Sequence, residues 1–80
     1  MARSAEEDGT VVEIFKIEKG EYIELHDLLK VTGICSTGGA AKIAITEGMV
    51  TVDGIVETRK RCKIKKGQAI QYRGKQIQVE

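Results

Sequence analysis

The sequence has no proline and no tryptophan, and its 80 residues include only three aromatic side chains, Phe15, Tyr22 and Tyr72. It also lacks any uninterrupted apolar run longer than three residues. A membrane-spanning helix needs about 20 apolar residues, and the apolar core of a signal peptide needs about seven. The sequence therefore predicts a cytosolic protein without membrane contact, and the scattered aromatics predict no stacking platform for single-stranded RNA.

Soft metal ligands are equally scarce, because the chain has one histidine, His26, and two cysteines, Cys35 and Cys62. A closed zinc site uses four ligands, of which two are usually close in sequence. We therefore expect no bound metal, and we expect both cysteines to be free thiols. Cys35 is expected to be a packed thiol. The cations around Cys62 suggest a lowered pKa there, but no neighbouring residue supplies the positioned general base that a reactive thiol would use.

A chain of this length is expected to form one small domain with few buried residues to spare for an active site. Gly33 and Gly38 have the glycine spacing of a phosphate-binding loop, but Gly39 stands where that motif requires lysine. No convincing catalytic pair is present. We therefore expect no enzyme activity, no cofactor and no small-molecule substrate.

Charge is distributed unevenly along the chain, although the net charge is only +1. Residues 1–30 carry eight acidic and four basic side chains, whereas residues 59–75 carry eight basic side chains and no acidic one. A local positive field of this kind attracts an anionic partner even when the whole molecule is nearly neutral. A charged face that only contacts solvent would give the same pattern, so the charge distribution alone leaves both interpretations open.

The N-terminal part of the sequence predicts a tail followed by extended structure. Residues 1–9 are polar and acidic without periodicity, which predicts a disordered tail before a single domain at residues 10–80. A segment rich in branched residues at 11–17, a turn at Lys19-Gly20 and a second extended segment at 22–25 predict an N-terminal hairpin.

Two short helices are predicted next. Leucines recur at helical spacing between residues 25 and 31, and Gly33 follows, so a first helix is expected there. Ser36 and Thr37 are candidate N-caps of a second helix that runs to about Glu47. Lys42 points away from the apolar arc of this helix and is expected to be exposed. The arc comprises Ala40, Ala41, Ile43, Ala44 and Ile45.

The hydrophobic period changes to two after Gly48. Residues 50–56 alternate around Asp53-Gly54, and residues 70–79 alternate around Gly74, so each segment predicts a β-hairpin. Together these elements predict an α+β fold in which two short helices pack on a small, mainly antiparallel sheet.

The segment at residues 59–66 combines a basic composition with the alternation of a half-buried strand. If it is extended, Cys62 and Ile64 face inward, and four cations project on the opposite face about 6.6 Å apart, in a row suited to phosphates. These cations are Arg59, Arg61, Lys63 and Lys65. A charged edge strand that resists aggregation would look similar.

Four separated blocks of the sequence agree in order and spacing with one known family. These blocks are residues 24–30, 36–42, 47–54 and 66–70. Between Tyr22 and Val79 the chain thereby resembles the S4 RNA-binding domain. Within that family it is similar to stand-alone bacterial proteins of the YbcJ type, which share the Gly-Gly-x-Ala-Lys stretch and the block at residues 57–61.

The resemblance implies an S4-like αL motif, in which two helices, a loop and a hairpin offer a basic surface to structured RNA, either ribosomal or transfer RNA. It implies no cofactor, and we expect a monomer. The arginine that many members carry near the start of the second helix is absent at residues 37–39, which is expected to reduce affinity. Asp53 replaces the usual asparagine of its turn, which should matter little. The expected RNA-binding residues are Lys30, Thr37, Lys42, Arg59, Lys60, Arg61, Lys63 and Lys65.

A protein–protein adaptor is the alternative hypothesis. Its acidic N-terminal third and basic C-terminal third would bind different partners, or each other in a dimer. The two hypotheses require different surfaces. RNA binding requires Lys42 and the cations at residues 59–65 on one continuous face, whereas an adaptor requires an exposed apolar patch.

Overall fold

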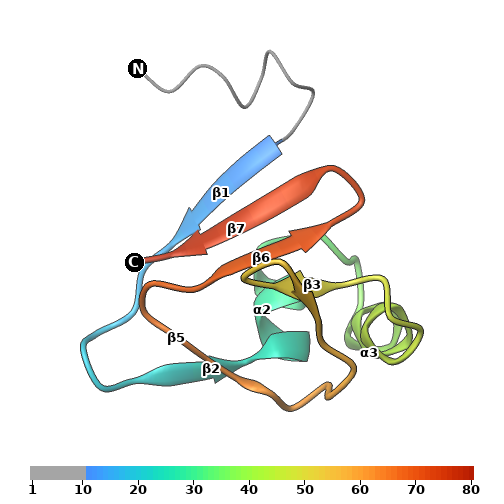
Figure 1. The fold of residues 1–80 in the computed structure, drawn as a ribbon, viewed down its shortest axis with the longest axis horizontal. Coiled ribbons are helices and arrows are strands. Elements are labelled where there is room, and N and C mark those ends of the chain that lie inside the picture. Colours follow the sequence, from blue (N-terminus) through green and yellow to red (C-terminus); the bar gives the residue numbers. More distant parts are fainter. Residues whose placement is uncertain (1–10) are drawn as a thin grey trace.

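The computed structural model of the chain describes residues 11–80, so the predicted tail at residues 1–9 lies outside the described residues. Two helices and seven strands occur in this part of the chain (Figure 1). In chain order they are β1 Val11–Phe15, β2 Tyr22–Glu24, α2 Leu25–Val31, α3 Gly38–Thr46, β3 Thr51–Val52, β4 Ile55–Val56, β5 Lys63–Lys65, β6 Ala69–Tyr72 and β7 Lys75–Val79. Over residues 11–80 no helix has both the length and the apolar character that crossing a membrane requires.

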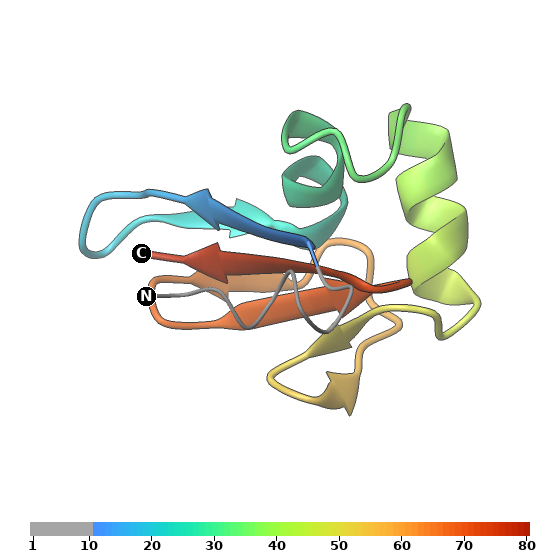
Figure 2. The ribbon, with the colours of Figure 1, turned by 90° about the horizontal axis from the view of Figure 1, so that it is seen from above.

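The strands form two sheets, and α2 and α3 lie together on one side of them (Figure 2). The first sheet has the strand order β1-β7-β6-β3-β4, and the second pairs β2 with β5. Every strand pair is antiparallel except β1 with β7. The structure therefore confirms an α+β fold of two short helices packed on a mainly antiparallel sheet.

An apolar core fills the space between the helices and the sheets. Phe15 and Tyr72 are half-buried and pack against this core. Burial of apolar surface is the dominant favourable term in folding, so these contacts hold the two sheets and the helices together. The largest fully buried side chains of residues 11–80 are Leu25, Leu28, Leu29, Ile45, Val50, Ile64, Ile70, Ile77 and Val79.

The predicted N-terminal hairpin is wrong, because β1 and β2 each pair with another strand. β1 runs parallel to β7 and places Phe15 beside Val79. β2 runs antiparallel to β5 and places Ile23 beside Ile64. Val79 and Ile64 are both fully buried, so each strand adds its apolar side chain to a different part of the core. The alternation of apolar and polar residues predicts both strands but does not identify the strands with which they pair.

The two helices begin where the sequence predicts. α2 covers the predicted residues, and α3 begins after Thr37, whose side-chain oxygen accepts a hydrogen bond from the Ala40 N–H (3.0 Å). Lys42 is exposed, as predicted. The buried arc is narrower than predicted, because Ala40 and Ile43 are exposed and only one side of α3 faces α2 and the core. The buried residues of α3 are Ala41, Ala44 and Ile45.

Two hairpins end in the tight turns that the sequence predicts. Asp53 and Gly54 join β3 to β4 with positive φ values, as in a two-residue hairpin turn. Arg73 and Gly74 do the same between β6 and β7. The Asp53 N–H donates to the Ala69 carbonyl (2.7 Å), and Asp53 Oδ1 accepts from the Ala69 N–H (3.0 Å). Asp53 therefore ties its turn to β6.

Replacing Ile64 by alanine should destabilise the domain by about 2–5 kcal/mol, because the side chain is fully buried and its removal leaves a cavity. Ile55→Ala is the matched control, since Ile55 is 73% exposed. It should change the free energy of unfolding by no more than about 0.5 kcal/mol. Urea denaturation of the parent and both variants measures these values. Equal losses in the two variants would contradict the core described above.

Candidate nucleic-acid interface

The basic segment that follows β4 is only partly a strand. β5 covers Lys63–Lys65, where buried Ile64 lies between two exposed lysines, as predicted. Residues 59–62, which we call the basic turn, instead bend back, and the Cys62 N–H donates to the Arg59 carbonyl (3.1 Å). The predicted row of four cations along one strand is therefore wrong. β2 offers only three residues for pairing because α2 begins directly after it.

Backbone hydrogen bonds hold the basic turn against the first turn of α2. The Leu25 N–H donates to the Cys62 carbonyl (2.9 Å). The His26 N–H donates to the Lys60 carbonyl (3.1 Å). The first N–H groups of a helix have no partner within the helix, and no side chain of the described residues caps α2. The carbonyls of the basic turn therefore accept hydrogen bonds from N–H groups in the first turn of α2, while the side chains of Lys60 and Arg61 stay exposed.

An open groove, which we call the basic groove, brings together cations from the basic turn and β5. None of the residues that line it is acidic, and all but Cys62 are predicted RNA-binding residues. Positive side chains that converge on one open surface suit the oxygens of a phosphate backbone. The lining residues are Arg59, Arg61, Cys62, Lys63 and Lys65.

Arg59 is anchored by Glu57, a contact that the sequence analysis did not predict. Arg59 Nε donates to Glu57 Oε2 (2.9 Å), and Arg59 Nη2 donates to Glu57 Oε1 (3.1 Å). The side-chain hydrogen bond from Arg59 is the main cause that lowers the pKa of Glu57 to about 2. Glu57 therefore orients the guanidinium at the groove and offsets part of its charge. An acid two residues before an arginine is too common in sequences to reveal such a pair.

The prediction for the Cys35 thiol is confirmed, whereas the prediction for the Cys62 thiol is not. Burial raises the pKa of the Cys62 thiol, and the neighbouring Glu57 carboxylate raises it further. The lowered pKa expected for Cys62 is therefore wrong, because these two effects outweigh that of the Arg59 guanidinium. Cys35 is buried, as predicted for a packed thiol, and burial raises its pKa as well.

The remaining predicted site residues, which we call the helix group, are Lys30, Thr37 and Lys42. Lys30 lies in the last turn of α2, and its Cδ would be 4.0 Å from a Cβ placed on Gly38, the first residue of α3. Thr37 caps α3, and Lys42 is exposed on the same helix. The seven residues of α2 span about 10 Å between the basic turn at one end and Lys30 near the other.

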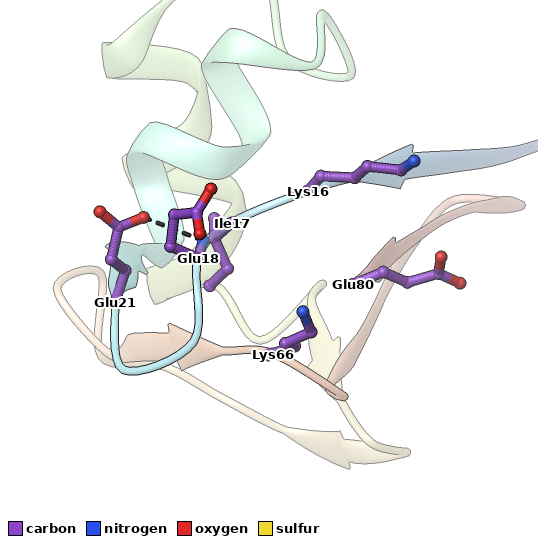
Figure 3. Close-up of a pocket in the computed structure, with 6 residues that line it drawn as sticks. All are labelled: Lys16, Ile17, Glu18, Glu21, Lys66 and Glu80. Carbon is purple, nitrogen blue, oxygen red and sulfur yellow. Dashed lines mark hydrogen bonds between the residues drawn. The ribbon is translucent and has the colours of Figure 1, made fainter.

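A second cleft, which the sequence analysis missed, lies where the β1–β2 connection, the β5–β6 turn and the last residue meet (Figure 3). Within it the Glu18 N–H donates to Glu21 Oε1 (3.0 Å). Carboxylates outnumber lysines in this cleft, so its charge does not suit RNA. The lining residues are Lys16, Ile17, Glu18, Glu21, Lys66 and Glu80.

One cluster of metal-ligating side chains occurs in the described residues, at Glu24, His26 and Asp27, with ligand atoms within 4.8 Å of one another. His26 Nε2 lies 2.8 Å from Glu24 Oε1, and His26 Nδ1 lies 3.4 Å from Asp27 Oδ1. The two carboxylates face different ring nitrogens. Contacts with the imidazole therefore account for the cluster, and we assign no metal to it.

Replacing Glu57 by glutamine should lower Tm at neutral pH, because the carboxylate that holds Arg59 is lost. The pKa of Glu57 is lowered from 4.5 to about 2, so its contribution to stability is complete above pH 4.5 and disappears as the pH falls through about 2. The Tm difference between parent and variant, followed by circular dichroism, should shrink over that interval. A difference that stays constant down to the lowest pH would contradict this ion pair.

Comparisons with known proteins identify one family and several similar proteins. Residues 15–80 match the family model of the S4 domain. YbcJ of Escherichia coli (strain K12) and an uncharacterized YbcJ protein of Shigella flexneri are each 54% identical to the chain over 65 residues, which cover 81% of this chain and 93% of each relative. The solution structure of E. coli YbcJ, described as revealing an αL motif involved in RNA binding, matches with a TM-score of 0.65 and 53% identity, over 82% of this chain and 84% of that one. The chain therefore belongs to the S4 domain family.

Proposed function

We propose that this chain is a non-enzymatic, cytoplasmic protein that binds structured RNA through the basic groove. The observation that carries the proposal is the capping of α2 by the basic turn, which anchors a groove lined by four cations. The S4 family membership supports it, as does the αL motif described for E. coli YbcJ. Ribosomal or transfer RNA is the proposed ligand, and the protein would act as a monomer.

Binding of this kind depends on phosphates and shape more than on base sequence. The major groove of an RNA helix is too deep and narrow for side chains to read, so a protein contacts mainly the backbone and the shallow minor groove. Arg61, Lys63 and Lys65 form no salt bridge within residues 11–80, and their charges are available to phosphates. Arg59 contributes less because Glu57 offsets its charge.

The helix group would extend this surface from the basic groove toward α3. An RNA backbone that crosses α2 could reach both sets of cations, because the helix is only about 10 Å long. Lys30 and Lys42 are exposed and would contact phosphates, while Thr37 would offer its hydroxyl. The resemblance implies an arginine near the start of α3, where Thr37, Gly38 and Gly39 stand, so this end of the surface would contribute less affinity.

A protein–protein adaptor is the second candidate, because apolar side chains are exposed on β1 and β4. Val12 and Ile14 of β1 are 41% and 51% exposed, and Ile55 of β4 is 73% exposed. β1 and β4 are opposite edges of the five-stranded sheet, so these side chains do not form one continuous patch. The cations, in contrast, line a single groove, which favours the RNA-binding proposal.

Binding to a structured RNA should weaken steeply with salt, because cations that neutralise phosphates release condensed counterions. If three to five phosphates are engaged, a plot of log affinity against log salt should have a slope on the order of −2 to −4.5. Fluorescence anisotropy with a labelled ribosomal or transfer RNA fragment measures this slope. A flat plot between low and physiological salt would rule out the electrostatic mechanism.

Alanine at Arg61, Lys63 or Lys42 should reduce RNA affinity several-fold and make the salt slope less steep by roughly 0.7–0.9 per lost phosphate contact. Each side chain is exposed, so the free energy of unfolding should change by no more than about 0.5 kcal/mol. Lys19→Ala is the matched control, because Lys19 is also exposed but lies in the turn between β1 and β2, next to acidic residues. If the Arg61 and Lys42 variants stay folded and bind as well as the parent, the adaptor becomes the better explanation.

A further inference from the structure

One aromatic side chain of this domain is exposed beside the basic groove. All three aromatic residues lie in the described part of the chain, and two of them, Phe15 and Tyr72, are half-buried against the core. Tyr22, in contrast, is 50% exposed. Packing against the core therefore does not explain why residue 22 is aromatic.

The pairing of β2 with β5 places this ring next to two cations of the groove. Tyr22 lies directly opposite Lys65 in the register. Cross-strand neighbours point to the same face of a sheet, so Tyr22 and the lysines of β5 project outward, while Ile23 and Ile64 point toward the core. Lys63 Nζ lies 4.9 Å from the centroid of the Tyr22 ring, within the range of a cation–π contact.

A half-exposed ring with a lysine over one face offers what a single unpaired nucleotide needs, once the lysine moves from the ring to a phosphate as the base stacks. A nucleobase stacks on an aromatic face regardless of its identity, and a cation next to that face meets the phosphate of the same nucleotide. Bases within an RNA duplex are stacked on one another and do not offer their faces to a protein, whereas bases in bulges and loops do. One ring is too little for a single-strand platform but enough for one base.

We propose that Tyr22 is a stacking position for one unpaired nucleotide adjacent to the RNA duplex that the basic groove contacts. The inference rests on the proposed function and makes it more specific: the RNA ligand contains a bulged or looped nucleotide beside a helical segment. Lys63 pairs with the backbone of that nucleotide, and Lys65 and Arg61 hold the neighbouring duplex.

Two RNA hairpins that differ by one nucleotide test this proposal. One has a fully paired stem, and the other carries a single bulged 2-aminopurine, whose fluorescence is quenched when it stacks. The parent protein should bind the bulged hairpin at least about fivefold more tightly than the paired one, since base–aromatic stacking is worth at least that factor. Binding should also quench the 2-aminopurine fluorescence.

Three variants separate stacking from other contributions. Tyr22→Phe keeps the ring and should retain both the preference and the quenching. Tyr22→Leu should bring the affinity ratio close to one and abolish the quenching, while affinity for the paired hairpin stays unchanged. Lys63→Ala should lower affinity for both hairpins. Circular dichroism melting of each variant confirms that it is folded before binding is measured.

The outcomes distinguish this inference from the function on which it rests. If the parent binds both hairpins equally, or if Tyr22→Leu retains the preference and the quenching, the stacking position is excluded and RNA binding stands. If the parent binds neither hairpin at low salt, RNA binding itself is contradicted, and the stacking position at Tyr22 is contradicted as well.

Discussion

The hydrogen bonds between the basic turn and the start of α2 are the contact on which the interface depends. A helix leaves its first N–H groups without partners, and here the N–H groups of Leu25 and His26 find carbonyls in a segment that is distant in the sequence. The backbone of the basic turn faces the helix, so its charged side chains remain in solvent. The hydrogen bonds that satisfy the first N–H groups of α2 thus also hold the backbone that carries these cations.

Burial of a few apolar side chains stabilises the strand that carries part of the positive charge of the basic groove. Ile23 and Ile64 face each other across β2 and β5, and Ile64 is fully buried, which anchors a strand whose other two residues are lysines. Like charges gathered in this way repel one another, and Glu57 offsets part of that repulsion at Arg59. An anionic partner would offset the rest, as the RNA-binding proposal requires.

Local signals in the sequence predicted the helices and tight turns, because each of those features depends on residues close together in the chain. The cap at Thr37 and the turn at Asp53-Gly54 are examples. Strand partners depend on which distant residue covers which apolar side chain, so the pairing of β1 with β7 could not be predicted. The bend at residues 59–62 was missed for a related reason: its alternation is that of a strand, but β2 is too short to pair with it. The charge pattern and the family resemblance together supplied the candidate site residues, whereas the Glu57–Arg59 contact required coordinates.

We expect structured RNA to occupy the basic groove at the start of α2. Titration of the ¹⁵N-labelled protein with a ribosomal or transfer RNA fragment, followed by amide chemical shifts, tests it most directly. The largest changes should occur in the basic turn, in β5 and at Leu25 and His26, whose N–H groups bond to the turn. Changes confined to the edge strands β1 and β4, with the basic turn unaffected, would contradict it.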